Sequence, residues 1–242
     1  MSLIVIDYLA RANCENVCCQ ILPDHVDGCQ DGKMAGVAQI RPYRGVEAAE
    51  RLSRRRRRLL DAGLDLLGAE DPEAELTVRA VCRRADLTAR YFYESFSDKD
   101  EFVAAVFDAS VADIAASTQA AVATSPPADQ NRAGMANLVR TVSADSRIGR
   151  VLFDVRLSDP VILRKRGDLG DIFAVLAGQH VESSLRRNPN SRLKATVRFV
   201  VGGVGQTLSA WLAGDIDLDQ DQLIDQLAAI VDELANPLLY GG

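Results

Sequence analysis

Arginine side chains are concentrated between residues 41 and 58. Six arginines occupy the eight positions from Arg51 to Arg58, and Arg41 and Arg44 precede them. Guanidinium groups bind phosphate oxygens well, so a cluster of this kind favours contact with a polyanion. The chain as a whole has 28 basic and 34 acidic residues and a net charge of −6, which excludes a uniformly basic surface. A solvated helix face or an exposed tail would fit the same arginines.

Four of the five cysteines lie in the first 33 residues: Cys14, Cys18, Cys19 and Cys29. Together with His25 they lack the paired C-x2-C or H-x3-H steps of the usual zinc sites, so we expect no metal site and no cofactor. Disulfides also fit poorly in a chain that has few other cysteines and that we expect in the cytoplasm. Because this segment differs from the rest, we predict that residues 1–45 are an atypical, disordered leader. Met34 is our hypothesis for the native start.

The sequence contains no recognisable catalytic constellation. It has only two histidines and neither an HExxH motif nor a Ser/His/Asp spacing. The glycines at 202, 203 and 205 lack the G-x-G-x-x-G order that a phosphate-binding loop requires. No apolar run reaches 18 residues, so no membrane span is predicted. We therefore expect neither an enzyme nor a membrane protein.

From about residue 46 onward, the sequence pattern predicts helices almost throughout. A first helix starts near Val46 and ends before Asp71-Pro72, with an apolar face at three- and four-residue steps. That face comprises Leu52, Leu59, Leu60, Ala62, Gly63, Leu66 and Leu67. Ser125-Pro126-Pro127 is the clearest break. Beyond it we predict helices over residues 130–143, 145–157, 160–187, 191–213 and 219–235, which makes the fold class all-α.

Two short helices are predicted between the first helix and the next long one. Thr77 and Thr88 are candidate N-caps, and Asp86-Leu87 forms the tight turn between the helices. A long helix begins at Ser97-Asp98. Two short helices joined by a tight turn and preceded by a longer one constitute a helix-turn-helix. Its second helix would fit the DNA major groove, where Arg90 could contact guanine through two hydrogen bonds.

The stretch from Leu76 to Asp100 resembles the DNA-binding signature of the tetracycline-repressor (TetR) family. The matching points are Thr77-Val78-Arg79, then Phe92-Tyr93 with Phe96, then Ser97-Asp98-Lys99-Asp100. One departure is Asp86, where the family usually has glycine in the turn. Asp tolerates the left-handed backbone better than most residues, so the turn can form.

The resemblance implies a role for each matching position. Thr77, Tyr93 and Lys99 would contact phosphates, positions 88–91 would face the groove, and the arginine run would add phosphate contacts. The predicted DNA-binding residues are Arg54, Arg55, Thr77, Thr88, Ala89, Arg90, Tyr91, Tyr93 and Lys99. Tyr91 fits a core position equally well. Phe92 and Phe96 are expected in the core, and Arg83 and Arg84 on a solvated helix face.

The resemblance also implies a division of the chain. A helix-turn-helix domain would cover residues 46–112, with the motif at 76–95, and a helical effector-binding and dimerisation domain would cover 113–242. Candidate ligand-binding residues are Leu152, Phe153, Phe173, Leu176 and His180, although each fits a core or surface position as well. They suggest an apolar or amphipathic inducer.

The last two helices of such proteins usually pair with those of a second copy. Candidate dimer-interface residues are Val201, Val204, Leu208, Leu223, Leu227 and Ile230. The small residues Gly202, Gly203, Gly205 and Ala210 would allow close helix approach, or the glycines would mark a kink. The overall hypothesis is a ligand-responsive transcriptional regulator. As a homodimeric repressor it would bind a palindromic operator in double-stranded DNA and be released by a small-molecule inducer. The alternative is a helical protein-interaction module without selective DNA binding.

Overall fold

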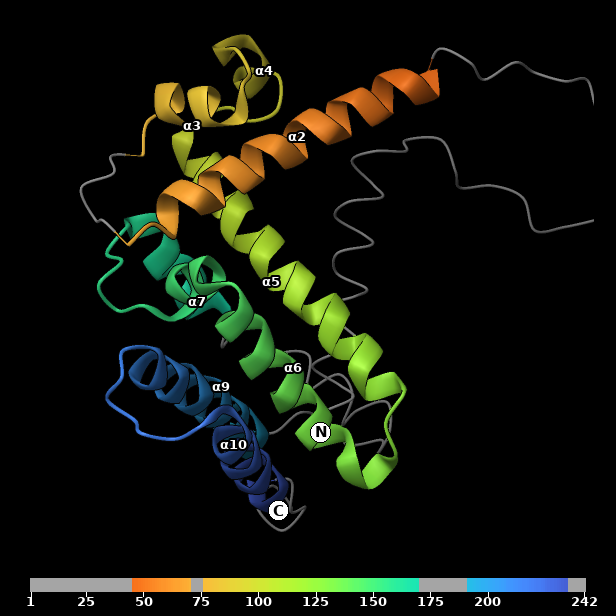
Figure 1. Ribbon diagram of the computed structural model, residues 1–242, viewed down its shortest axis with the longest axis vertical. Coiled ribbons are helices and arrows are strands. Elements are labelled where there is room, and N and C mark those ends of the chain that lie inside the picture. Colours follow the sequence, from red (N-terminus) through yellow and green to blue (C-terminus); the bar gives the residue numbers. More distant parts are fainter. Residues whose placement is uncertain (1–44, 71–75, 170–190, 235–242) are drawn as a thin grey trace, which may run out of the picture.

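The computed structural model describes residues 45–70, 76–169 and 191–234, and all regular secondary structure in these ranges is helical (Figure 1). The predicted all-α fold class is therefore confirmed. The predicted leader lies outside these ranges except for its last residue. In chain order the helices are α2 (Gly45–Leu67), α3 (Val78–Ala85), α4 (Ala89–Tyr93), α5 (Lys99–Ala123), α6 (Gln130–Ala144), α7 (Ser146–Phe153), α9 (Ser191–Leu212) and α10 (Gln220–Leu234), with a 3-10 turn at Pro127–Asp129.

Helices α2, α3 and α4 and the start of α5 form one end of the molecule, seen at the top of Figure 1. Their core is a cluster of aromatic rings in which Phe92, Phe96 and Phe102 lie with centroids 5.1 to 5.5 Å apart. All three side chains are buried, as is Leu59 of α2. The core positions predicted for Phe92 and Phe96 are thus confirmed, and α4 is fixed to the domain by its own aromatic side chain.

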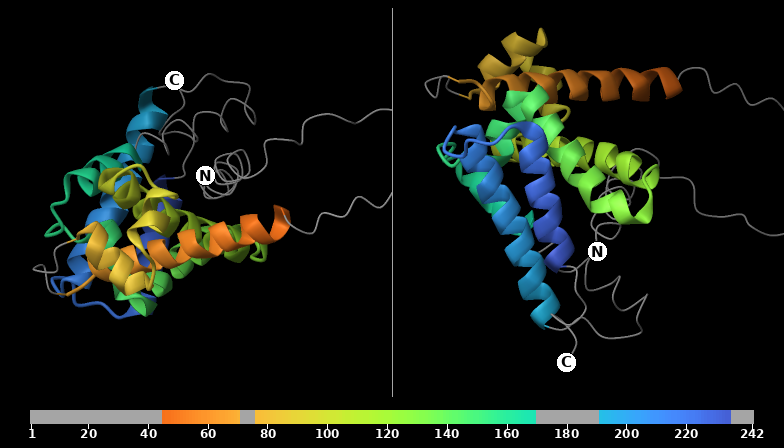
Figure 2. Two further views of the ribbon diagram at one scale, coloured as in Figure 1. Left: turned by 90° about the horizontal axis from the view of Figure 1, so that it is seen from above. Right: turned by 60° about the horizontal axis from the view of Figure 1, so that its bottom comes forward.

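The apolar face predicted for the first helix is wrong at its N-terminal end. Leu59, Ala62 and Leu67 are buried, but Leu52 is 46% exposed. The reason is geometric, because α2 begins at Gly45 and its first turns project beyond the helices on which its later turns pack (Figures 1 and 2). The start of α2, which includes Leu52, therefore projects from the domain and is not part of its core.

The C-terminal helices pack in sequence against one another. Helix α6 lies along α5, and α10 lies along α6, with α9 beside α10 in both Figure 1 and Figure 2. The turn between α9 and α10 passes through Gly214 at φ +83, and the Trp211 indole donates a hydrogen bond to the Leu218 carbonyl at 2.8 Å. Among the described residues, no helix is long and apolar enough to cross a membrane.

Two predicted helices differ in extent from what the structure describes. The helix predicted over 145–157 ends at Phe153, because Asp154 adopts an extended conformation and its side chain accepts hydrogen bonds from Arg156. Residues 160–169 are helical as predicted, and the remainder of the predicted 160–187 helix lies outside the described residues. Helix α5 runs unbroken across the domain boundary predicted at 112–113.

Three of the six residues predicted at the dimer interface are covered by this chain itself, and the interface stays a prediction. Leu208, Leu223 and Leu227 are buried within this chain, where they pack with Ala136, Val139 and Val142 of α6. A side chain that its own protomer covers has no surface left for a second copy. Val201 and Val204 are half-buried and Ile230 is exposed, so these three keep accessible surface.

Candidate nucleic-acid interface

Local hydrogen bonds set the start of α3 and the turn that follows it. The Ala80 amide donates to Thr77 Oγ1 at 3.1 Å, so Thr77 is the predicted N-cap. Asp86 follows α3 with φ 51 and ψ 50, and its amide reaches the carbonyls of Arg83 and Cys82. Asp thus occupies the left-handed position that favours glycine. The turn predicted at Asp86-Leu87 is confirmed.

Helix α4 begins differently. Thr88 occupies the N-cap position, but its side chain makes no capping hydrogen bond, so that part of the prediction is wrong. Its carbonyl instead accepts from the Tyr91 amide at 3.0 Å. The exposed hydroxyl of Thr88 is therefore not used to hold α4.

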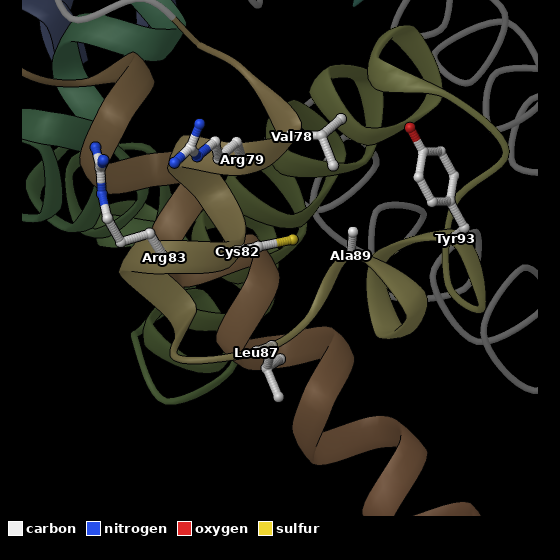
Figure 3. A pocket seen from close by; sticks show the side chains of 7 residues that line it. All are labelled: Val78, Arg79, Cys82, Arg83, Leu87, Ala89 and Tyr93. Carbon is white, nitrogen blue, oxygen red and sulfur yellow. The ribbon is translucent and has the colours of Figure 1, made fainter.

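A shallow groove of about 550 Å³ lies between α3 and α4 (Figure 3). Its lining consists of Val78, Arg79, Cys82, Arg83, Leu87, Ala89 and Tyr93. Figure 3 shows Arg79 and Arg83 on one side and Tyr93 on the other. Tyr93 and Ala89 were predicted site residues, whereas Arg79 and Arg83 were not. Their spacing of four residues, on the face of α3 that carries Cys82, was the available signal.

The arginine run on α2 divides into two groups by its contacts. Arg56 Nη1 donates to the Ser95 carbonyl at 2.9 Å, and Arg58 Nη2 donates to the Ala85 carbonyl at 2.6 Å. Burial lowers the pKa of Arg56, against the opposing effect of the Glu101 carboxylate. These two side chains hold α2 against the ends of α3 and α4, so they are structural.

The other two predicted arginines, Arg54 and Arg55, contact side chains of α2 and α4 instead. Arg54 pairs with Glu50 at 3.5 Å and is largely exposed. The guanidinium carbon of Arg55 lies 4.0 Å from the ring centroid of Tyr91, a cation–π contact that covers part of the tyrosine. Tyr91 is accordingly half-buried, between the core and groove positions that its sequence allowed. Arg54 and Arg55 remain able to face a phosphate backbone.

The remaining predicted residues lie on the same end of the molecule. Arg90 and Tyr93 are exposed on α4, and Arg90 pairs with Glu94. Lys99 is the exposed first residue of α5. There, Asp98 Oδ1 accepts from the Glu101 amide at 2.8 Å and Glu101 Oε2 accepts from the Ser97 amide at 2.7 Å. This reciprocal cap stabilises the helix end that presents Lys99.

The predicted ligand-binding residues lie in different environments, and three of them lie outside the described residues. Leu152 is buried in the core cluster that α2, α3, α4 and α5 share, which fits the core alternative. Phe153 is half-buried and packs against both core clusters. Phe173, Leu176 and His180 lie outside the described residues.

Comparison with known proteins identifies the N-terminal part of the chain. Residues 59–106 match the model of "Bacterial regulatory proteins, tetR family". No curated protein sequence matches the chain. The matched segment includes the whole helix pair, the turn at Asp86 and the groove between α3 and α4.

Several solved structures share the fold over most of their length. The fatty acid degradation regulator FadR from Bacillus halodurans is 12% identical, with 77% of this chain and 95% of that chain covered and a TM-score of 0.56. FadR from Bacillus subtilis in complex with stearoyl-CoA is 14% identical, with 72% and 96% covered and a TM-score of 0.53. A TetR-like transcriptional regulator from Rhodococcus sp. RHA1 is 19% identical, with 78% and 97% covered and a TM-score of 0.51.

The family match covers the helix-turn-helix, and the fold likeness extends through the C-terminal helices. The resemblance seen in the sequence is thereby confirmed: residues 59–106 match the TetR family model, and the chain as a whole shares an all-helical fold with solved TetR-like structures.

Proposed function

We propose that this chain is a ligand-responsive repressor that binds a palindromic operator as a homodimer and is released by a small-molecule inducer. The observation that carries the proposal is the basic groove between α3 and α4, which brings Arg79 and Arg83 next to the face of the short recognition helix. A helix of this kind fits the major groove of DNA, where its side chains reach base edges.

The proposed contacts divide into two kinds. Thr77, Tyr93 and Lys99, with Arg54 and Arg55 on the projecting part of α2, contact phosphates and set the register of the protein on the duplex. Thr88, Ala89 and Arg90 face the base edges. Tyr91 contributes through the cation–π contact that orients Arg55. Arg79 and Arg83 are added here as phosphate or base contacts, because they line the same groove.

We propose a domain division that follows the same contacts. In this division residues 46–112 bind DNA, and residues 113–242 bind the effector and a second copy. The accessible face of α9 supports the dimer, because Phe199 is 66% exposed and a methyl group added at Gly202 or Gly203 would meet nothing within 4 Å. Val201 and Val204, on the other side of α9, and Ile230 of α10 also keep accessible surface. Two recognition helices would then lie about 34–36 Å apart on successive half-sites.

The proposed inducer is apolar or amphipathic. The Bacillus subtilis FadR structure contains stearoyl-CoA, and the Bacillus halodurans protein is named a fatty acid degradation regulator. Long-chain acyl-CoA is therefore the first compound to test against the complex with DNA. An inducer acts by binding two arrangements of the dimer with different affinity, which changes the separation of the recognition helices.

The competing proposal is a helical protein-interaction module whose helix pair serves only as a scaffold. In either case no enzymatic activity is proposed. Salt dependence separates the two candidates, because binding through several Arg and Lys contacts to phosphate weakens steeply with added salt and an apolar protein interface need not. The exposed arginines of α2 and α3 favour the DNA-binding candidate.

The experiment is a titration of the purified full chain against the DNA upstream of its own gene at two salt concentrations, followed by selection from random DNA sequences. We expect selective binding that falls at high salt, and a large loss of affinity in Arg79→Ala and Arg83→Ala. Arg132→Ala is the control, because Arg132 pairs with Asp225 at 2.7 Å among the C-terminal helices. Binding that no sequence improves and that salt does not weaken would support the interaction module instead.

A further inference from the structure

Glu94 makes a specific contact with the residue proposed to read a base. Arg90 Nε donates to Glu94 Oε1 at 2.9 Å, and Glu94 is the C-cap residue that directly follows α4. The Arg90 side chain is 84% exposed and the Glu94 side chain is 36% exposed. Within the described part of the chain the two Nη atoms of Arg90 have no partner. The hydrogen bond therefore holds the Arg90 guanidinium through Nε and leaves its Nη1 and Nη2 atoms available to a ligand.

This geometry restricts how Arg90 can meet a base. A guanidinium has five N–H donors and can address guanine O6 and N7 through its Nη1–Nη2 edge or through its Nε–Nη2 edge. Because Glu94 occupies Nε, only the Nη1–Nη2 edge remains for a two-pronged contact. The side chain also loses less conformational freedom on binding DNA, because the hydrogen bond already limits its rotamers.

We propose that Glu94 is a positioning residue for sequence recognition: it fixes the Arg90 guanidinium through Nε, so that preference for guanine at one operator position depends on both residues. The inference rests on the proposed function, in which α4 lies in the major groove of DNA. Glu94 itself needs to touch no base. It acts through the orientation of Arg90.

The charge of Glu94 gives the proposal a distinctive signature. A carboxylate near DNA repels the phosphates, so its removal raises affinity for DNA of any sequence. Loss of the hydrogen bond at Nε frees the guanidinium and lowers the preference for guanine. Selectivity and general affinity therefore change in opposite directions. A residue that only stabilised α4 would lower both.

The test compares four variants of the full chain: Glu94→Ala, Glu94→Gln, Arg90→Ala and the double Arg90→Ala/Glu94→Ala. Each is taken through random-sequence selection and then titrated against the selected site with all four bases at the Arg90 position. Asp100→Asn is the matched control, because it removes a negative charge from the exposed start of α5 and leaves the pair intact. An exposed pair adds little to folding, and circular dichroism checks that each variant folds.

For the wild-type chain we expect a preference for guanine of about tenfold or more, the size of a two-pronged arginine contact. Glu94→Ala should reduce it to about twofold and bind unselected DNA more tightly, and Glu94→Gln, which retains an acceptor, should fall between. The double variant should show no more loss of preference than Arg90→Ala. Asp100→Asn should tighten general binding and keep the preference.

Two results would overturn the proposal, and they differ in meaning. A guanine preference that Arg90→Ala abolishes and Glu94→Ala preserves would exclude the positioning role and leave the proposed function standing. A wild-type chain that selects no sequence would overturn the proposed function, and the role of Glu94 with it.

Discussion

Asp65 of α2 and Arg147 of α7 form an ion pair across 82 positions of the sequence. The other carboxylate oxygen of Asp65 accepts from Arg84 Nε of α3 at 2.7 Å. Arg147 is held in turn by Asp145, which precedes α7. The Asp65 side chain is only 22% exposed. One carboxylate thus joins the helix-turn-helix to the C-terminal helices.

The first prediction concerns the stability that this carboxylate provides. Asp65→Asn removes a charge that two guanidinium groups share, so we expect the free energy of unfolding to fall by about 1–3 kcal/mol. Urea unfolding measures it. Asp221→Asn is the control, because Asp221 pairs with Arg140 at 3.5 Å in an exposed position and such pairs contribute about 0–1 kcal/mol. Equal losses in the two variants would contradict the bridging role of Asp65.

The second prediction is the pH dependence of that stability. Burial opposes ionisation of Asp65, but hydrogen bonds from Arg84 and Arg147 outweigh it and lower its pKa. A hydrogen bond from Arg147 lowers the pKa of Asp145 as well. An aspartate whose folded-state pKa is lowered stabilises the fold fully above its unfolded-state pKa, about 3.9, and this stabilisation is lost as pH falls through the folded-state value. Urea midpoints measured from pH 6 downward should drop below about pH 4, and less steeply in Asp65→Asn.

The third prediction uses the close approach of α2 and α5. A methyl group added at Gly63 would lie 2.5 Å from Phe102 Cζ and 2.6 Å from Val106 Cγ2. Gly63→Ala should therefore cost about 1–3 kcal/mol of stability through overpacking. Gly167→Ala is the matched control, because a methyl group there meets nothing within 4 Å and alanine favours a helix by up to about 1 kcal/mol over glycine. In thermal unfolding we expect the melting temperature to fall in Gly63→Ala and to rise in Gly167→Ala. A higher melting temperature in Gly63→Ala would contradict the close packing of α2 on α5.

The fourth prediction separates the two threonines that begin α3 and α4. Thr77 caps α3 through its side chain and Thr88 makes no such bond. Thr77→Ala should lower stability by about 0.5–2 kcal/mol, and Thr88→Ala by much less. Under the proposed function both lower DNA affinity, so the comparison distinguishes a structural from a recognition role. A larger stability loss in Thr88→Ala would contradict the capping geometry.

The fifth prediction concerns the left-handed turn residue. Asp86 has φ 51 and pairs with Arg58 at 3.5 Å from an almost fully exposed carboxylate. Asp86→Ala should destabilise the chain by about 1 kcal/mol, because the Cβ stays in this unfavourable conformation while alanine has no polar group to bond locally. Asp86→Gly should be neutral or stabilising, since glycine adopts the conformation freely. Melting temperatures that rank the alanine variant above the glycine variant would contradict the backbone argument, because both variants lack the ion pair with Arg58.

The helix-turn-helix could be predicted from sequence because its signals are local. The cap at Thr77 and the turn at Asp86 each depend on neighbours within a few residues. The sequence could not show which arginines of the run on α2 are structural and which are free to contact DNA. Arg56 and Arg58 find their carbonyl partners 39 and 27 residues away, and nothing in a row of identical side chains distinguishes them from Arg54 and Arg55.

By itself the sequence determined the helices, the motif and the presence of an apolar face on each of the last two helices. The tertiary structure alone decided what those faces meet. Leu208, Leu223 and Leu227 pack against α6 of their own chain, and the opposite side of α9, with Phe199, stays accessible. The physical reason is that hydrophobic periodicity specifies which side of a helix avoids water, but any apolar surface satisfies it, so the choice between an intrachain core and a second copy depends on how the distant helices are arranged.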